Sequence, residues 1–297
     1  MTRSGFVVLA GRPNVGKSTL ANAIVGAKVA IVSDRPQTTR RAVRGVATDQ
    51  AAGWQMVLVD LPGVQRPRDV LTQRMQRRVE RELAGSDAIL FVINGEQGVG
   101  PGDRFIAQQL LAARGDTPVV CAVNKLDRLR PPEAAKALSD TDDLDVADEI
   151  FPISAKLATG LGPLTEHLVG LLPDGPFMYP PEDHSDEPSE VHLAELIREQ
   201  ILRRTRDELP HAVEVSVQSI EPREDGLIDV LAQVWVESES QKGILIGRGG
   251  RMVREIGSGA RSEIERDLGA KVFLDLQVRV RERWRRDEGL LDRLGIE

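Results

Sequence analysis

The sequence has a single cysteine, no long apolar run and no overall excess of positive charge. Each of these features, if present, would point to a particular class of protein. A single cysteine, Cys121, excludes an intramolecular disulfide framework and suits a reducing cytosol. The longest apolar runs span only a few residues, too short for a bilayer helix, and the N-terminus lacks a signal-peptide pattern. The net charge of −7 argues against a protein coated in nucleic acid, although such a total can hide a local basic face.

The composition that remains is that of a globular protein, with 41% hydrophobic and 29% charged residues. A length of 297 residues allows two domains. Up to about residue 172, short β-rich runs alternate with helical stretches, which predicts a mostly parallel sheet flanked by helices. The runs are 6–10, 54–60, 88–94, 119–124 and 150–154. Cys121 lies inside one of them and is expected to be a buried core residue.

The pattern changes after residue 172. Residues 173–190 hold five prolines and many acids, a composition that predicts an interdomain linker separating two sites. A helical stripe over 190–209 follows, and then two alternating segments, 211–220 and 227–236, predict a hairpin. Two helices up to about residue 268 and a strand at 271–280 complete a small α+β domain, residues 191–297.

A phosphate-binding loop is the most specific motif of the chain. Residues 11–19, G-R-P-N-V-G-K-S-T, match G-x-x-x-x-G-K-[ST] directly after an apolar strand. The glycines let backbone N–H groups surround a phosphate, Lys17 reaches the β- and γ-phosphates, and the Ser18 hydroxyl is a ligand for Mg²⁺. The predicted nucleotide contacts here are Gly11, Asn14, Val15, Gly16, Lys17, Ser18 and Thr19.

Two later motifs predict that the base is guanine. In N-K-L-D, residues 124–127, the Asp127 carboxylate can accept hydrogen bonds from guanine N1–H and the 2-amino group, which adenine does not offer. Asn124 can brace the base and the phosphate loop, and the stem of Lys125 can lie on the ring. The S-A-K sequence then places the backbone of Ser154, Ala155 and Lys156 near guanine O6. The nucleotides expected are therefore GTP and GDP.

The segment D-L-P-G, residues 60–63, predicts the catalytic side of the site. Asp60 can hold Mg²⁺ through water, and the Gly63 N–H can sense the γ-phosphate. The sequence Q-T-T-R offers Thr39 or Thr38 as a second hydroxyl on Mg²⁺, and Thr39 is preferred because it directly precedes the arginine. The metal set is then Ser18, Thr39 and Asp60, and the catalytic set is Lys17, Thr39, Gly63 and Asn14.

A glutamine that orients the attacking water in Ras-like GTPases is missing, because Val64 follows the D-x-x-G glycine. The sequence is similar in this respect to GTPases with a hydrophobic residue here, some of which use a bound K⁺. Their phosphate loop carries an asparagine, at the position of Asn14, as a potassium ligand. Asn14 can also be only a good turn residue, so both interpretations stay open.

The segment I-L-I-G-R-G-G-R resembles the G-x-x-G loop of a KH domain, which single-stranded RNA approaches closely. Residues 242–286 contain twelve Lys or Arg and six Asp or Glu, a local excess that suits a phosphate-tracking face. The alternative is a tight helix hairpin with a solvated surface. Trp284 can stack on a base or cover the end of the sheet. The predicted RNA contacts are Lys242, Ile246, Gly247, Arg248, Gly249, Gly250 and Arg251.

Together, these motifs and G-P-F-x-Y-P in the linker resemble the Era family of bacterial GTPases over nearly the whole chain. The resemblance implies a phosphate-loop GTPase domain (1–172), a linker (173–190) and a type II KH domain (191–297). It also implies GTP hydrolysis, binding to the 3′ end of 16S ribosomal RNA, and a checkpoint in assembly of the 30S subunit. The implied location is cytoplasmic, with peripheral contact at the inner membrane, and no obligate oligomer is implied.

Two other classes of function stay open. The C-terminal domain can dock a protein or a membrane instead of RNA, which the net acidity favours. The phosphate loop can also serve a metabolic phosphotransferase, although N-K-L-D and S-A-K count against that.

Overall fold

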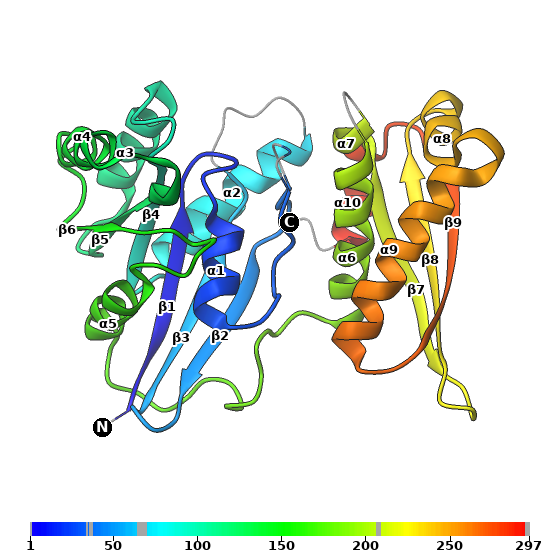
Figure 1. Ribbon diagram of the computed structural model, residues 1–297, viewed down its shortest axis with the longest axis horizontal. Coiled ribbons are helices and arrows are strands. Elements are labelled where there is room, and N and C mark those ends of the chain that lie inside the picture. Colours follow the sequence, from blue (N-terminus) through cyan, green and yellow to red (C-terminus); the bar gives the residue numbers. More distant parts are fainter. Residues whose placement is uncertain (1, 34, 36–37, 64–69, 206–208, 295–297) are drawn as a thin grey trace.

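The computed structural model describes residues 2–33, 35, 38–63, 70–205 and 209–294, which form two domains side by side (Figure 1). None of the helices within these ranges is both long and apolar enough to cross a membrane. The N-terminal domain comprises β1 (Arg3–Ala10), α1 (Lys17–Val25), β2 (Val43–Asp49), β3 (Trp54–Asp60), α2 (Val70–Ala84), β4 (Ala88–Asn94), α3 (Pro101–Ala113), β5 (Val119–Asn124), α4 (Pro131–Asp142), β6 (Glu149–Pro152) and α5 (Leu161–Leu171).

The N-terminal sheet has the strand order β2-β3-β1-β4-β5-β6, and only β2 runs antiparallel to its neighbour. The parallel strands are the five that the apolar runs predict. Strand β2 was not predicted, because Arg44, Gly45 and Asp49 weaken its pattern. As an edge strand that pairs on one side with β3, it needs less apolar surface than the strands beside it.

Both faces of this sheet are covered, so its central strands are apolar on both sides. In β1, Val7 and Leu9 pack toward α1 and α5, whereas Val8 and Ala10 pack toward α2 and α3. Cys121 of β5 is fully buried in the second of these clusters, and burial raises the pKa of its thiol to about 12. The expectation of a core cysteine is confirmed. Because parallel strands end at one edge, the loops after β1, β3 and β5 meet there.

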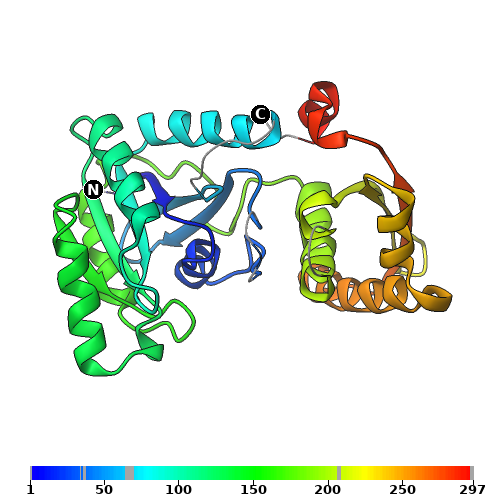
Figure 2. The ribbon, with the colours of Figure 1, turned by 90° about the horizontal axis from the view of Figure 1, so that it is seen from above.

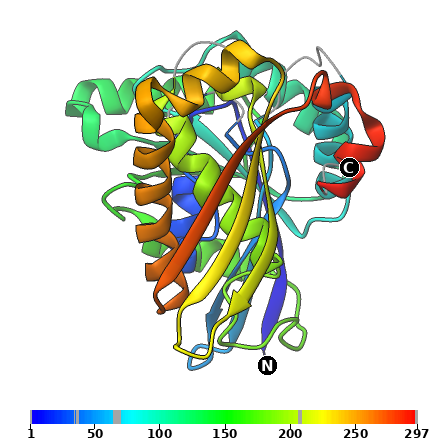
Figure 3. The same ribbon diagram turned by 90° about the vertical axis from the view of Figure 1, so that its right-hand side faces the viewer.

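The C-terminal domain is a three-stranded sheet with helices on one face, while its other face is turned to the viewer in Figure 3. The order is β7-β8-β9, with β7 and β8 antiparallel and β8 and β9 parallel. Its elements are α6 (Ser189–Arg204), α7 (Leu209–Ala212), β7 (Glu214–Pro222), β8 (Ile228–Val236), α8 (Glu239–Ile246), α9 (Arg251–Leu268), β9 (Val272–Val280) and α10 (Glu288–Arg293).

The predicted order of helix, strand, strand, helix, helix, strand is confirmed, but two boundaries are wrong. The first long helix ends at Arg204 instead of about residue 209. The first strand begins at Glu214 instead of His211, because residues 209–212 form the short helix α7. The alternating pattern of 211–220 does not distinguish this helical turn from the start of the strand.

The segment between α5 and α6 lies along the N-terminal domain. Buried Gln55 of β3 accepts hydrogen bonds from the backbone N–H groups of Met178 (2.7 Å) and Tyr179 (2.9 Å). The Val46 N–H of β2 donates to the carbonyl of His184 at 2.8 Å. This proline-rich segment is therefore held against the N-terminal domain.

Helix α6 lies on the side of the C-terminal domain that faces the N-terminal domain (Figure 1). Residues 193–202 are buried all around the helix. Apolar residues such as Leu193, Ile197 and Ile201 pack on the C-terminal sheet. Glu195, Arg198 and Glu199 are buried by contact with the N-terminal domain, although their charges suggest a solvated face.

Candidate functional site

The loop between β1 and α1 has the backbone of an anion-binding turn. Gly11, Asn14 and Gly16 have φ values of 147°, 64° and 104°, respectively. A Cβ atom on Gly16 would lie 2.3 Å from Nδ2 of Asn124, so only glycine fits there. Lys17 is buried, and its Nζ donates to the carbonyls of Gly11 (3.1 Å) and Arg12 (3.2 Å). Burial lowers the pKa of Lys17, and the nearby Asp60 carboxylate opposes that change.

Three oxygen-bearing side chains meet beside this loop. The Ser18 hydroxyl donates to Asp60 Oδ2 at 2.5 Å, and Thr39 Oγ1 lies 3.2 Å from Ser18 Oγ and 3.3 Å from Asp60 Oδ2. Asp60 is fully buried, and its Oδ1 has no hydrogen-bond partner among the described residues. Burial raises the pKa of Asp60, whereas Lys17 lowers it. Two hydroxyls and a carboxylate with a spare oxygen are the hard donors that Mg²⁺ prefers, so these residues fit that ion.

The structure separates the two threonines of the Q-T-T-R sequence. The Thr39 hydroxyl belongs to the group with Ser18 and Asp60. The Thr38 hydroxyl instead donates to the Arg35 carbonyl at 2.6 Å. Only Thr39 is therefore in position to share an ion with Ser18.

The N-K-L-D and S-A-K segments join into one group at the ends of β5 and β6. Asn124 Nδ2 donates to the Val15 carbonyl at 2.9 Å, while its Oδ1 accepts from the N–H groups of Lys125 (2.7 Å) and Ala155 (2.9 Å). The Ser154 hydroxyl donates to Asp127 Oδ1 at 2.6 Å. Asn124 thus ties the phosphate loop to the segment that carries the base-binding candidates.

The remaining nucleotide candidates lie around this group. Lys125 Nζ donates to the Asn14 carbonyl at 2.8 Å, and Lys156 is exposed. Asn14, Thr19 and Gly63 line the cleft that also contains Lys17 and Ser18. Val64, at which the sequence analysis notes a missing glutamine, lies outside the described residues.

The G-x-x-G loop lies between α8 and α9 as a tight exposed turn. Gly247, Gly249 and Gly250 have positive φ values of 69°, 61° and 77°, respectively. A Cβ atom at Gly247 would lie 2.8 Å from Met252 Cβ, whereas one at Gly249 would point into open space. Arg248 and Arg251 are exposed, and Lys242 and Ile246 are half-buried on the adjoining helix α8.

The structure shows whether Trp284 can stack on a base or is a packing residue. This side chain is fully buried, and its Nε1 donates to the Ala212 carbonyl at 2.8 Å. It packs in an apolar cluster with Leu71 and Met75 of α2 and Leu290 and Leu291 of α10. Helix α10 consequently lies against the end of α2 (Figure 2). Trp284 is a packing residue, so it is not available to stack on a base.

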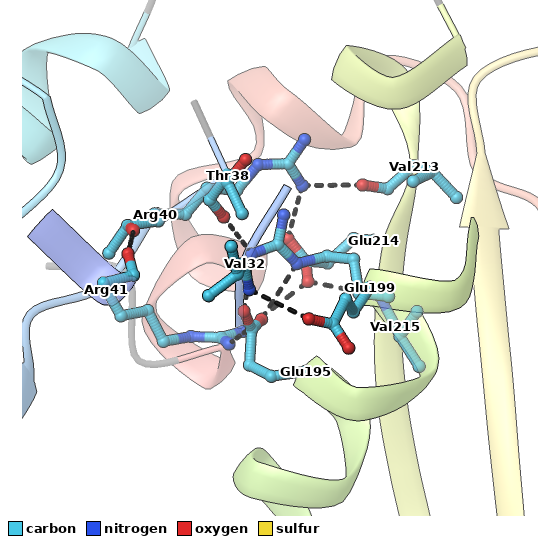
Figure 4. A network of polar contacts seen from close by, with 12 residues as sticks. Val32, Thr38, Arg40, Arg41, Glu195, Glu199, Val213, Glu214 and Val215 are labelled. Atoms are coloured by element: carbon cyan, nitrogen blue, oxygen red, sulfur yellow. Dashed lines mark hydrogen bonds and ion pairs between the residues drawn. The ribbon is translucent and has the colours of Figure 1, made fainter. Parts of the chain in front are cut away.

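A network of buried charges, which the sequence motifs do not predict, joins the two domains (Figure 4). It connects Val32 and residues 38–41, which lie between α1 and β2, with α6 and the start of β7. The residues that it adds to the candidates are Arg40, Arg41, Glu195, Arg198, Glu199 and Glu214. The two domains are therefore in direct contact as well as joined by the linker. Alternation of valine and glutamate over 213–215 is ordinary for a strand, so it did not mark Glu214 as part of an interface.

Comparisons with protein-family models divide the chain in the same way. A model described as a 50S ribosome-binding GTPase matches residues 6–125, and a KH domain model matches residues 208–285. Among individual proteins, the chain is 47% identical to GTPase Era of Mycobacterium sp. (strain JLS), covering 99% of both. It is 48% identical to GTPase Era of Mycobacterium tuberculosis (strain ATCC 25177 / H37Ra), covering 99% of this chain and 98% of that one.

Two solved structures agree with the whole fold. One is a crystal structure of Era in complex with MgGDPNP and nucleotides 1506–1542 of 16S ribosomal RNA. It matches with a TM-score of 0.94 and 33% identity over 100% of this chain and 99% of that one. The other is a single-residue variant of Aquifex aeolicus Era bound to GDP·AlF4⁻, with a TM-score of 0.94, 34% identity and 99% coverage of both chains.

Proposed function

Because the chain belongs to the GTPase Era family, we propose that it hydrolyses GTP and binds the 3′ end of 16S ribosomal RNA during assembly of the 30S subunit. The observation that carries the proposal is the resemblance of both domains at once to the Era structure that contains MgGDPNP and this RNA. A phosphate loop alone would support only nucleotide binding, and a G-x-x-G turn alone would support little.

The arrangement of the nucleotide site suggests a role for each group. Lys17 and the backbone N–H groups of residues 14–18 hold the β- and γ-phosphates. Ser18, Thr39 and Asp60 would hold Mg²⁺, which when bound neutralises charge on the phosphate oxygens. The Gly63 N–H, beside the phosphate loop, would detect the γ-phosphate. These groups orient GTP and stabilise developing charge, which is the main requirement of phosphoryl transfer.

Base selection depends on Asp127. The Ser154 hydroxyl donates to Asp127 Oδ1 at 2.6 Å, which fixes the orientation of the carboxylate. Guanine offers two donors to a carboxylate in this orientation, whereas adenine offers no such pair. The site would thus bind GTP and GDP and reject ATP.

The C-terminal domain would bind RNA at the turn between α8 and α9. Its glycines, of which Gly249 is exposed, let a phosphate backbone approach closely, and Arg248 and Arg251 supply positive charge. The location that we propose is the cytoplasm, and the resemblance adds peripheral contact with the inner membrane.

We expect K⁺ to stimulate hydrolysis more than Na⁺, because Val64 has no group that can orient water. Hydrolysis of GTP should be at least about threefold faster in KCl than in NaCl at equal ionic strength, since a second cation adds charge stabilisation. Turnover should be compared in both salts for the wild type, Asn14→Ala and Asn14→Gly.

The glycine variant is the matched control for this experiment. Asn14 has a φ of 64°, so alanine both removes the amide and strains the backbone, whereas glycine removes only the amide. A potassium role predicts that both variants lose the difference between the salts. Equal wild-type rates in KCl and NaCl would exclude K⁺ as the activator.

The proposed RNA partner can be tested by crosslinking. The full-length protein is irradiated in cell lysate with GTP present, and the crosslinked RNA is sequenced. We expect reads concentrated at the 3′ end of 16S ribosomal RNA. Recovery of membrane lipid or protein without enriched RNA would instead favour the alternative in which the C-terminal domain docks a different partner.

A further inference from the structure

The residues on both sides of Thr39 are held by the C-terminal domain (Figure 4). On one side, Arg198 Nη2 of α6 donates to the carbonyl of Thr38. On the other side, Arg40 Nη1 donates to Glu214 Oε2 at 2.8 Å and to the Val213 carbonyl at 2.6 Å. The peptide units that join residues 38, 39 and 40 are thus fixed at both ends by groups of another domain.

A second row of contacts supports the first. Arg41 Nη1 donates to Glu195 Oε1 at 3.1 Å, and Arg198 Nε donates to the same oxygen at 2.9 Å. Arg41 Nε also donates to the carbonyl of Leu294, just after α10, at 2.5 Å. Glu195 therefore orients both Arg198, which binds the Thr38 carbonyl, and Arg41.

These contacts are largely buried, so their loss would be costly. Arg198 has no exposed surface, and the side chains of Arg40 and Glu214 are 2% and 1% exposed. Although burial alone raises the pKa of Glu214, the guanidinium groups of Arg40, Arg41 and Arg198 hold it below its usual value. A buried charge without its partners is costly, so the segment cannot shift without losing several contacts together.

We propose that Arg198 and Glu214 are positioning residues for the Thr39 hydroxyl, so that the C-terminal domain completes the magnesium site of the N-terminal domain. The inference rests on the proposed GTPase function and assigns part of that site to a different domain. Thr39 Oγ1 lies 3.2 Å from Ser18 Oγ and 3.3 Å from Asp60 Oδ2, and a shift of about 1 Å in residues 38–40 would misplace it.

The decisive variant is Arg198→Met, which keeps an unbranched apolar stem but removes the guanidinium donors. The Thr38 carbonyl then loses its hydrogen bond from Arg198, so residues 38–40 are no longer held at that end. We expect kcat for GTP to fall by about tenfold or more and the Mg²⁺ concentration for half-maximal rate to rise severalfold. GDP affinity should change less than about twofold, because in GTPases the corresponding segment contacts Mg²⁺ and the γ-phosphate, which GDP lacks.

A double-mutant cycle separates positioning from simple attachment of the domains. If Arg198 acts through Thr39, the double variant Arg198→Met/Thr39→Ala should hydrolyse GTP about as slowly as Thr39→Ala alone. Effects that multiply would overturn the proposal. The control is Glu263→Gln, which removes a 3.2 Å interdomain ion pair with Lys28 and touches none of residues 38–41. Its rate should stay close to that of the wild type.

Two further measurements keep the result clear. Circular dichroism and thermal unfolding show whether Arg198→Met is folded. If that variant does not fold, Glu214→Gln is used instead, because glutamine keeps the shape of the side chain. The expected loss of kcat is then smaller. A folded variant with wild-type kcat and Mg²⁺ dependence would overturn the positioning role alone. Absence of GTP hydrolysis by the wild type would instead overturn the proposed function.

Discussion

Replacing Asp127 with asparagine should lower the affinity for GTP by about 100-fold or more and admit xanthosine nucleotides. The carboxylate accepts two hydrogen bonds from guanine, and each charged bond contributes about 1.5–3 kcal/mol. An amide presents a donor where the guanine 2-amino group also donates. Xanthine carries a carbonyl at that position, so the same amide donor finds an acceptor.

Calorimetric titration with GDP, XDP and ADP measures this exchange. Asp116→Asn is a suitable control because it removes the same charge from an exposed loop between α3 and β5. ADP should remain a poor ligand for all three proteins. If Asp127→Asn binds GDP as tightly as the wild type does, the residue has no place in the base site.

Placing aspartates at Arg248 and Gly249 should lower the affinity for single-stranded RNA by more than about 30-fold at low salt. The change removes one positive charge and adds two negative charges where phosphates would approach. The fold should survive, because a side chain at Gly249 meets open space and aspartate tolerates the left-handed conformation found there. The wild-type affinity should itself fall as salt rises.

The binding experiment requires the full chain rather than residues 190–297 alone. Helix α6 is buried on the side that faces the N-terminal domain, so an isolated C-terminal domain would expose Arg198 and Glu199. Arg266→Asp is the control, because it lies in the last turn of α9, roughly 22 Å along the helix from the loop. A folded double variant that binds RNA as the wild type does would remove the G-x-x-G loop from the contact.

Local motifs predicted the individual parts of the site because each part depends on a short stretch of chain. The phosphate loop needs a strand, a glycine turn and a helix start, all within residues 3–25. The alternation of strands and helices also predicted the mostly parallel sheet, at one edge of which the loops carrying Asp60 and Asn124 meet. By contrast, the choice between Thr38 and Thr39 depends on which side chain turns toward Ser18. The sequence favoured Thr39 only because it directly precedes the arginine.

The domain interface was not predictable, because its charges follow the pattern of a solvated helix face. Glu195, Arg198 and Glu199 have the i, i+3 and i+4 spacing of ordinary surface ion pairs. Their partners, such as Arg41, lie more than 150 residues earlier in the sequence. Charges that pair with each other on a solvated helix face and charges that pair with a second domain at a buried interface therefore give the same pattern within one helix.

The path of the linker also protects the N-terminal domain from self-association. Strand β2 is an edge strand, and an exposed edge presents unpaired N–H and C=O groups to any other extended chain. Among the described residues, the linker meets the backbone of this edge over residues 184 and 185, through the Gly45–Ser185 bridge and the bonds Val46 N–H to His184 and Ser185 Oγ to Arg44. Its prolines, including Pro180 and Pro181, cannot donate to a ladder, so it covers the edge without extending the sheet. A chain cut after α5 would leave β2 open to pairing between molecules, which is a route to aggregation.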